Sequence, residues 1–341
     1  MHAPLHHQAP IDPLALMKEV APFRHPQTAR SVFEILVTAV PFAVLWTLTW
    51  LAFDAGYVLG FLLQLPAGAF LLRLFLIQHD CGHDAFFAKR STNDWVGRIL
   101  GVLTFTPYDY WRRSHATHHA STGNLDARGV GDVDTLTVSE FLALSPRRRL
   151  LYRLYRHPIT LFGIGPAYLF LLRHRLPIGM MRKGWRPWLS VMGTNLAILA
   201  VAAAISSAIG VKMFLLVHLP ITLVAASMGV WFFYVQHQFE KTHWDAKDDW
   251  SFHAAALHGS SHYDLPPVLR WISANVGVHH VHHLAGRIPF YRLPEVMRKV
   301  PALADIGRVT LRESFGTVRL VLWDEGKRRL VSFREVRAAA H

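Results

Sequence analysis

Residues 57–83 read YVLGFLLQLPAGAFLLRLFLIQHDCGH. Up to residue 78 this stretch is apolar except for Arg73, which lies close enough to one end for its side chain to snorkel toward water. About 20 apolar residues cross the hydrocarbon core of a bilayer, so we expect this segment to span a membrane. The stretch ends in His79 and His83, whose spacing of four residues places both on one face of a helix.

The composition of the whole chain agrees with a membrane protein. Hydrophobic residues make up 52% of the 341 residues and charged residues only 17%, against roughly 25% charged residues in ordinary soluble domains. This balance excludes an intrinsically disordered chain, which needs low hydrophobicity and high charge. The single cysteine excludes an internal disulfide framework.

Four apolar segments have the length of a membrane span, and they pair into two hairpins. The turn within the first hairpin is only residues 54–56, and the turn within the second is the region of Gly210. We therefore expect an all-α membrane protein in which the chain crosses and returns twice. The four expected transmembrane helices are residues 33–53, 57–78, 188–209 and 211–235.

The formal net charge is +13, and the positive residues gather outside the spans. Arginine is frequent between the hairpins, from Lys89 to Arg186, and again after Arg298, whereas the outer turns carry almost no positive charge. By the positive-inside rule these regions and the N-terminus should be cytoplasmic. The charge has two compatible interpretations, which are contact with anionic lipid headgroups and docking of an acidic redox partner.

Histidine is unusually frequent, with 22 copies, and many of them are clustered at helical spacing. Offsets of three and four residues place side chains on one face of a helix, and the clusters lie where spans end or in the regions after each hairpin. They can therefore converge on one side of the membrane. Their number exceeds what one metal ion binds and fits two, and imidazole suits zinc, copper, iron and nickel. The clustered histidines are His79, His83, His115, His118, His119, His237, His279, His282 and His283.

Other residues near the clusters are expected to have structural roles. His280 directly follows His279 and should face away, either behind the ligands or at the surface. His218 lies within the fourth span without a neighbouring cluster, so we expect it to be buried and hydrogen bonded. Cys81 should be a small packing residue rather than a thiolate ligand. Four histidines follow the fourth span without tight spacing, namely His243, His253, His258 and His262.

Three motifs resemble the histidine boxes of membrane-bound fatty acid desaturases. They are HDCGH at 79–83, HATHH at 115–119 and HHVHH at 279–283, in the order HxxxH, HxxHH and HxxHH. The second hairpin falls between the last two boxes, as in that family, and the resemblance runs over roughly residues 33–330. Three further stretches are similar to bacterial acyl-lipid desaturases of the omega-6 (delta-12) type, namely FYVQHQFE at 233–240, GSSHYDLP at 259–266 and NVG at 275–277. One departure is His262, where relatives tend to carry tyrosine.

The resemblance implies a non-haem di-iron centre whose two iron ions are bound by the nine clustered histidines. It implies an oxygen-dependent enzyme that inserts a cis double bond into the acyl chain of a membrane lipid, using two electrons from outside. It also implies a polar residue near the metals, for which Asn275 is the candidate. The sequence has neither a cysteine cluster nor a nucleotide-binding glycine motif, so we expect a ferredoxin-type donor on the basic face.

Side chains around the boxes are candidates to support the centre. Metal-binding histidines usually donate their other ring N–H to a carboxylate or a carbonyl. Trp111 and Tyr110 precede the second box and are placed to wall an acyl channel. The nearby carboxylates are Asp80 and Asp84 at the first box and Asp126, Asp132 and Asp134 after the second.

We therefore expect one desaturase domain over residues 31–330, with a cytoplasmic helical cap holding the di-iron site, between a polar N-terminal tail (1–30) and a C-terminal tail (331–341). The apolar stretch Phe162–Leu172 contains glycine and proline and should be interfacial or re-entrant. A bacterial inner membrane is the expected location, and no nucleic-acid partner is expected.

Two alternative functions remain open at this point. The first is a related di-iron membrane hydroxylase or carotenoid ketolase, which would share the histidine chemistry. The second is a histidine-rich metal transporter, which should place ionisable residues along a path near the bilayer midplane rather than at one face.

Overall fold

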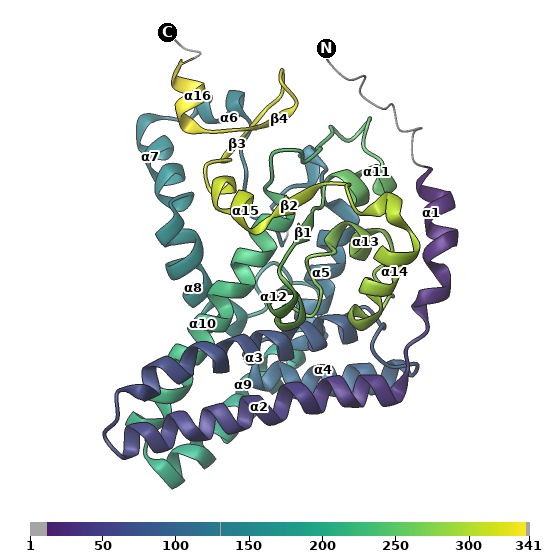
Figure 1. The fold of residues 1–341 in the computed structure, drawn as a ribbon. Coiled ribbons are helices and arrows are strands. Elements are labelled where there is room, and N and C mark those ends of the chain that lie inside the picture. Colours follow the sequence, from purple (N-terminus) through teal and green to yellow (C-terminus); the bar gives the residue numbers. More distant parts are fainter. Residues whose placement is uncertain (1–11, 130, 339–341) are drawn as a thin grey trace.

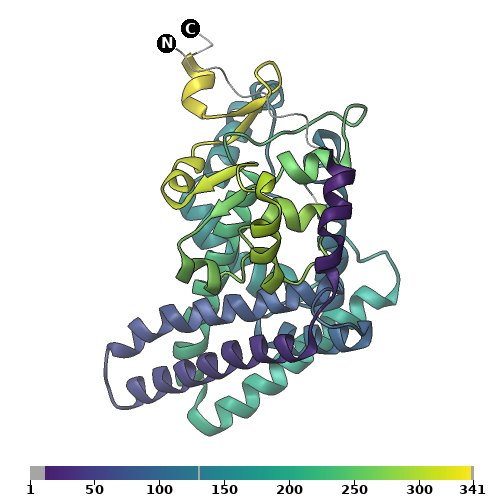
Figure 2. The ribbon, with the colours of Figure 1, turned by 45° about the vertical axis from the view of Figure 1, so that its right-hand side comes forward.

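The computed structural model describes residues 12–129 and 131–338 and consists mainly of helices in two layers. Long apolar helices form the lower layer of Figure 1, and shorter helices with two small sheets lie above them. Seen from a second direction, α2 (Thr28–Asp54) and α3 (Leu59–Gly82) run side by side near the base (Figure 2). The expected helical membrane architecture is confirmed.

The lower layer contains the two expected hairpins. The first is α2 and α3, and the second is α9 (Trp185–Ile209) and α10 (Val211–His237). Gly210 alone separates α9 from α10, at a φ of 85° that glycine adopts at little cost. All four helices are long and apolar enough to cross a membrane. The helix α3 extends four residues beyond the expected span, so His79 lies inside it and His83 follows its last residue.

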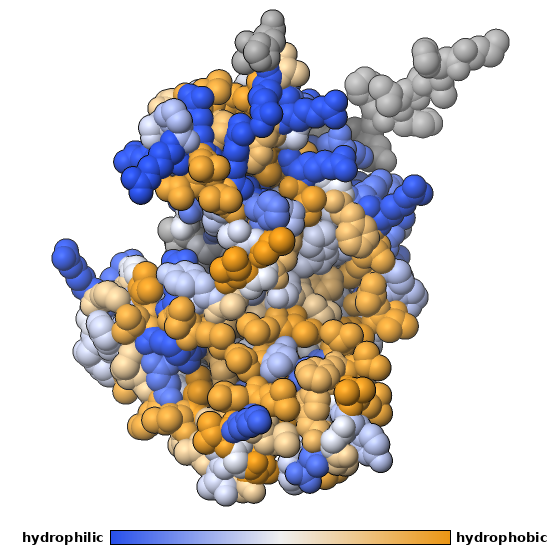
Figure 3. Space-filling view, turned by 90° about the vertical axis from the view of Figure 1, so that its left-hand side faces the viewer, coloured by the Kyte–Doolittle hydropathy of each residue, from blue (hydrophilic) through white to orange (hydrophobic). Residues whose placement is uncertain are grey.

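The outward faces of these helices are apolar. Leu36, Val40, Val44 and Leu48 along α2 are each between 45 and 55% exposed. Figure 3 shows hydrophobic residues gathered over the lower part of the molecule and hydrophilic residues over the upper part. An exposed apolar surface of this extent is unfavourable in water and is accommodated by the hydrocarbon of a bilayer.

Two helices connect the first hairpin to the upper layer, α4 (Arg90–Leu103) and α5 (Tyr108–Ser121). Their close approach requires glycine, because a Cβ added at Gly97 would lie 2.2 Å from the Tyr108 ring. The Tyr108 hydroxyl donates to the carbonyl of Cys81 at 2.9 Å, which fixes the start of α5 against the end of α3. Cys81 is fully buried, as expected for a packing residue.

The connection between the hairpins contains α6 (Val138–Ala143), α7 (Pro146–Tyr155), a π-helical turn (Thr160–Ile164) and α8 (Gly165–Leu171). The stretch Phe162–Leu172, which the sequence placed at the interface, forms the π-helical turn and α8, and both pack against α10. Ile164 and Tyr168 are 61% and 52% exposed. This segment therefore joins the membrane helices while keeping one apolar side open.

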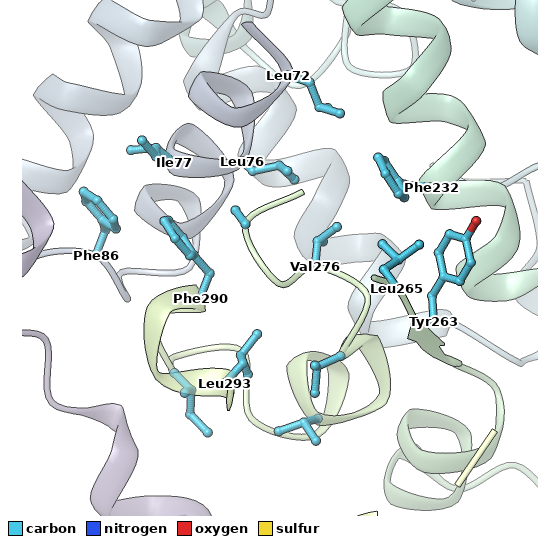
Figure 4. Packing of buried hydrophobic residues seen from close by; sticks show 14 of the residues in the cluster. Leu72, Leu76, Ile77, Phe86, Phe232, Tyr263, Leu265, Val276, Phe290 and Leu293 are labelled. Atoms are coloured by element: carbon cyan, nitrogen blue, oxygen red, sulfur yellow. The ribbon is translucent and has the colours of Figure 1, made fainter. Parts of the chain in front are cut away.

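Residues 238–338, which we call the cap, cover the ends of α3 and α10. Leu72, Leu76 and Ile77 of α3 belong to the same buried cluster as Val276 and Phe290 of the cap (Figure 4). This apolar layer joins the spans and the cap into one core. The elements that form the first part of the cap are α11 (Phe252–His258), β1 (His262–Asp264), α12 (Pro267–Ile272), α13 (His279–Leu284), α14 (Leu293–Lys299) and β2 (Arg308–Thr310).

The strands of the cap form two sheets of two strands each. In the first, β1 and β2 are parallel with Tyr263 opposite Val309. In the second, β3 (Leu322–Asp324) and β4 (Arg329–Val331) are antiparallel with Leu322 opposite Val331. Two short helices, α15 (Leu311–Thr317) and α16 (Phe333–Ala338), complete the cap. These strands are the one addition to an otherwise helical fold among the described residues.

Both segments expected to be tails take part in the fold. The helix α1 (Pro13–Val20) buries Leu16 and Val20 and contacts α11. At the other end, β4 and α16 contribute Val331 and Val336 to a cluster that also contains Phe141 of α6. Residues 1–11 and 339–341 of the expected tails lie outside the described residues.

The expectation that Arg73 snorkels toward water is wrong. Its side chain is 1% exposed and pairs with Glu34 of α2 at 2.5 Å. It also donates to the Thr38 hydroxyl at 3.1 Å and to the carbonyl of Trp271 in the cap. A buried guanidinium needs a charged partner and further hydrogen bonds, and here the partners come from α2 and from the cap. The same residue thus links the first hairpin to the cap.

Candidate metal centre

Five histidines from three helices form a first group, which we call cluster 1. His79 and His83 come from the end of α3, His115 and His119 from α5, and His282 from α13. One ring nitrogen from each lies within 4.8 Å of the others. His79 and His282 are buried, and the other three rings are partly exposed.

Four further histidines form a second group, which we call cluster 2. His118 comes from α5, His237 from the end of α10, and His279 and His283 from α13. All four are buried, and their ligand atoms also lie within 4.8 Å of one another. Every clustered histidine of the sequence analysis therefore belongs to one of the two groups.

The helical spacing explains how α5 and α13 serve both clusters. Neighbouring residues on a helix point about 100° apart. His118 and His119 are neighbours on α5, and the first belongs to cluster 2 and the second to cluster 1. His282 and His283 divide in the same way on α13. The rings of His119 and His283 stack at 4.0 Å and 10°, so the two clusters are adjacent.

The distances between ring nitrogens match a metal coordination sphere. The Nε2 atoms of His83 and His115 are 2.9 Å apart, those of His115 and His119 are 3.1 Å apart, and those of His237 and His279 are 3.0 Å apart. Two ligands that bind one metal at about 2.1 Å and at a right angle are separated by about 3.0 Å. The imidazoles of each cluster are therefore spaced to fit a metal ion.

Burial keeps these imidazoles in the form that binds metals. Burial lowers the pKa of His115 well below the ordinary histidine value, and the neighbouring His119 lowers it further. Burial, and after it the neighbouring histidines, also lower the pKa values of His282 and His283. A ring with a lowered pKa is neutral at neutral pH and offers a lone pair, which is the ligand form of histidine.

The loops before α13 bring it against α10. Ser261 accepts hydrogen bonds from the backbone N–H groups of His279 and His280, at 3.2 and 3.3 Å, through its carbonyl. The Ser261 hydroxyl donates to the carbonyl of Val235 on α10 at 3.2 Å, and the Gln236 side chain donates to the carbonyl of Val276 at 2.9 Å. These contacts place His279 beside His237, and they come from the stretches 233–240, 259–266 and 275–277.

Two aspartates contact histidines of the clusters. Asp132 accepts from Nδ1 of His118 at 2.5 Å, which leaves Nε2 of His118 directed to cluster 2. Burial raises the pKa of Asp132, but the adjacent His118 outweighs this and holds it below the ordinary value, so the carboxylate stays ionised. Asp80 lies 3.4 Å from Nδ1 of His79 and accepts from the backbone N–H of Phe290 at 2.6 Å. An ionised carboxylate in the position of Asp132 orients the ring and raises its basicity as a ligand.

The other polar residues proposed near the metals make different contacts. Asp84 pairs with Arg112 at 2.7 Å, and the Asn275 amide donates to the carbonyl of Phe290 at 3.1 Å. Asp126 accepts from the backbone N–H of Lys247. Among the described residues, neither Asp84 nor Asn275 makes a side-chain hydrogen bond to a clustered histidine.

The other histidines among residues 12–129 and 131–338 lie outside both clusters. His280 faces away as expected, but it is buried rather than at the surface, and its Nε2 bonds the carbonyl of Leu303 at 3.0 Å. His262 lies beside it and bonds the carbonyl of Ala304 at 2.7 Å. His218 is 9% exposed and accepts from the indole N–H of Trp46 at 3.3 Å, which matches the expected buried, hydrogen-bonded residue.

A cavity of about 580 Å³ runs from the clusters into the membrane layer. His79, His115, His118 and His279 line one part of it. Trp111 also lines it and stacks on His115 at 4.6 Å and 14°. The rest of the wall is largely apolar and comes mainly from α3, the π-helical turn, α8 and α10, including Leu72, Phe75, Ile164, Leu169, Ala225 and Gly229.

Tyr110 and Trp111 line this cavity as predicted, whereas its wall residues on α8 and α10 were not predicted from the sequence. The available signal was a stripe of small residues on α10, where Thr222, Ala225 and Gly229 recur at three- and four-residue intervals. Small side chains on one face of a membrane helix leave room beside the backbone, which either a neighbouring helix or a ligand fills.

The sequence of this chain is similar to a family model and to several known proteins. The family model described as "Fatty acid desaturase" matches residues 55–315. A protein named fatty acid desaturase from Bacillus subtilis (strain 168) is 44% identical over 322 residues, which are 94% of this chain and 91% of that protein. An sn-1 oleoyl-lipid 12-desaturase from Synechocystis is 30% identical over 66% of this chain and 64% of its own length. An sn-1 acyl-lipid omega-3 desaturase (ferredoxin) from the same organism is 28% identical over 78% of each chain. The chain therefore belongs to the fatty acid desaturase family.

Proposed function

We propose that this protein is an acyl-lipid desaturase that inserts a cis double bond into a lipid acyl chain. The observation that carries the proposal is the cavity, because its wall combines imidazoles of both clusters with apolar residues of the membrane helices. Ile164 of the π-helical turn and Tyr168 of α8 are exposed and line the same cavity, so an acyl chain can enter from the lipid. An apolar chain in this cavity would lie beside the candidate metal centre.

The nine histidines would hold two iron ions, one in each cluster. Family membership and the imidazole donors support iron, which imidazole binds well. Iron bound there would activate O2 and so supply the oxidising power toward unactivated methylene groups that protein side chains lack. In the overall reaction, a CH2–CH2 unit loses two hydrogens to become CH=CH, and O2 takes these hydrogens together with two donor electrons and two protons to give two waters.

The chain's own residues bind and orient the substrate. Trp111 and Phe233 contribute aromatic walls next to the histidines, and the close packing of aromatic rings around the clusters excludes water from the acyl chain. Asp132 fixes the tautomer of His118, because a carboxylate at Nδ1 requires the proton on that nitrogen. Substrate position and ligand orientation are therefore both set by side chains that line one cavity.

We propose omega-6 (delta-12) regiochemistry and a ferredoxin-type electron donor. The regiochemistry is supported by the similarity to an oleoyl-lipid 12-desaturase, and the donor by the printed name of the omega-3 relative. The net charge of +13 and the exposed Arg147 and Arg148 on α7 offer a basic surface to an acidic partner. In this proposal the active site lies on the cytoplasmic side of a bacterial inner membrane, as the positive-inside rule indicates.

The test is the fatty-acid profile of a bacterial host that expresses the full chain together with a ferredoxin system. We expect a new diene made from a monoene, with its double bond located by gas chromatography and mass spectrometry. Purified protein should contain about two iron ions per chain, one for each histidine cluster. A hydroxylated or ketolated product without a new alkene would contradict the proposal and favour the hydroxylase or ketolase reaction.

A further inference from the structure

The apolar cavity ends inside the membrane layer next to a second cavity. On α10, Thr222 lines the first cavity, whereas His218, one helical turn earlier, lines a second cavity of about 210 Å³. On the loop after α4, Thr104 lines the first and Phe105 lines the second. The second cavity lies among α2, α9 and α10, with Trp46, Ala202 and Phe214 in its wall.

Two aromatic side chains meet at the boundary between the cavities. The rings of Phe105 and His218 are 5.2 Å apart. His218 is held on its other side by Phe214, which stacks on it at 5.3 Å and 15°. Trp46 donates its indole N–H to His218 at 3.3 Å, so the ring is fixed from a third direction. The boundary is therefore built from rings with few free rotations.

The backbone at Phe105 is strained, and this strain places its ring. Phe105 has a φ of 56°, in the left-handed region that bulky residues rarely adopt. Arg175 donates to the carbonyl of Phe105 and so holds the strained peptide. A backbone conformation of this kind is energetically unfavourable and persists only where the surroundings enforce it, often at functional sites.

We propose that Phe105 and His218 close the acyl cavity at its membrane end and set how deeply the methyl end of the substrate penetrates. This inference rests on the proposed desaturase function and names two residues that would determine which carbons of the acyl chain are oxidised. The α10 face from Gln236 to Thr222 spans about 21 Å along the helix axis, a length on the scale of an extended fatty acyl chain. The methyl end stops at the Phe105 ring, so the distance from this ring to the histidine clusters selects the oxidised carbons.

The experiment joins the two cavities by removing the Phe105 ring. Phe105→Ala and Phe105→Gly are expressed as full chains in the host with the ferredoxin system and supplied with palmitoleoyl, oleoyl and eicosenoyl substrates. Glycine tolerates the positive φ at position 105, so the second variant remains informative if alanine folds poorly. Double-bond positions and relative yields are measured by gas chromatography and mass spectrometry, with iron content as the measure of folding.

We expect the new double bond to move away from the methyl end, because the chain slides deeper. The eicosenoyl-to-palmitoleoyl product ratio should rise by about tenfold, the low end of what one methylene is worth in an apolar pocket. Iron-loaded variants with the wild-type bond position and the wild-type ratio would overturn the inference. Absence of any new alkene from the wild-type chain would instead reject the proposed function itself.

A matched second substitution tests whether the second cavity receives the chain. Ala202 lines only the second cavity, so Ala202→Phe alone should leave the products unchanged. Combined with Phe105→Ala, it should restore the wild-type bond position by filling the added space. A double variant that keeps the shifted products would show that the chain does not enter this cavity, and would overturn the placement of the boundary.

Discussion

The helices α5 and α13 carry the same HxxHH spacing but are held in different ways. α5 has 14 residues and is anchored by Tyr108 and Tyr110, whose hydroxyls donate to the carbonyls of Cys81 and Ile178. α13 has six residues, all of them buried. A helix of this length is unstable alone, so its conformation depends on the surrounding core.

The residues inside each motif show the same difference. Ala116 and Thr117 of α5 are exposed, whereas the equivalent His280 and Val281 of α13 are buried. One motif can therefore be supported by the length of its own helix or entirely by its environment. Substitutions of the histidines should act alike on both helices, and substitutions between the histidines should matter only on α13.

The largest effect is expected for the stacked pair His119→Ala and His283→Ala, one from each helix and each cluster. Each variant should lose activity more than about 100-fold, because loss of a ligand exceeds the 10- to 100-fold typical of losing an outer partner. Lipid products and iron per purified chain are the measurements, with the exposed His157→Ala as the control. Near-normal products from either variant would show that its cluster does not hold a required metal.

The second prediction concerns Asp132, a carboxylate that contacts a histidine of α5 and, within the described part of the chain, has no counterpart at His279 of α13. Asp132 bonds His118, whereas Nδ1 of His279 on α13 has no partner among the described residues. Asp132→Asn should reduce iron affinity or activity by about 10- to 100-fold, because the amide no longer favours the correct tautomer. Competition with a chelator measures the affinity, and Asp126→Asn is the control. Equal effects of the two substitutions would show that the His118 contact has no special role.

The sequence predicted the histidine groups because helical spacing is a local property. Offsets of three and four residues were enough to bring His115, His118 and His119 onto neighbouring positions of α5. The assignment of each ring to a cluster was beyond the sequence, since it depends on how α5 and α13 are rotated against α3 and α10. The four spans were predictable for the same local reason, because apolar length alone defines them.

Long-range partners explain where the sequence analysis was wrong. Arg73 was expected to reach water because it lies near one end of its span. Its ion-pair partner Glu34 lies on another helix, and the Trp271 carbonyl that it also bonds is even more distant in the sequence, so local spacing could not reveal either partner. Asn275 was expected near the metals from the resemblance to the family. Its backbone has a φ of 53° and its amide donates to the carbonyl of Phe290, so a role beside the metals stays a prediction.

The third prediction compares equivalent positions inside the motifs. Burial lowers the pKa of His280 to about 3, so the ring is neutral and bonds the carbonyl of Leu303. His280→Ala leaves that carbonyl unpaired and should cost about 1–3 kcal/mol of stability. The reciprocal Ala116→His on α5 is exposed and should be nearly neutral. Thermal unfolding in detergent is the measurement, and a catalytic loss as large as that of His283→Ala at unchanged stability would assign His280 to the metal site.

The smallest effects are expected one position further, at Val281 and Thr117. Val281 is fully buried in the core, so Val281→Ala should destabilise the protein by about 1–2 kcal/mol through lost apolar contact. Thr117 is exposed and bonds only the carbonyl of Arg113 in its own helix, so Thr117→Ala should stay within about 0.5 kcal/mol. The same unfolding measurement compares the two. Equal losses of unfolding free energy in the two variants would contradict the comparison. They would mean that α5 depends on its surroundings as much as α13 does.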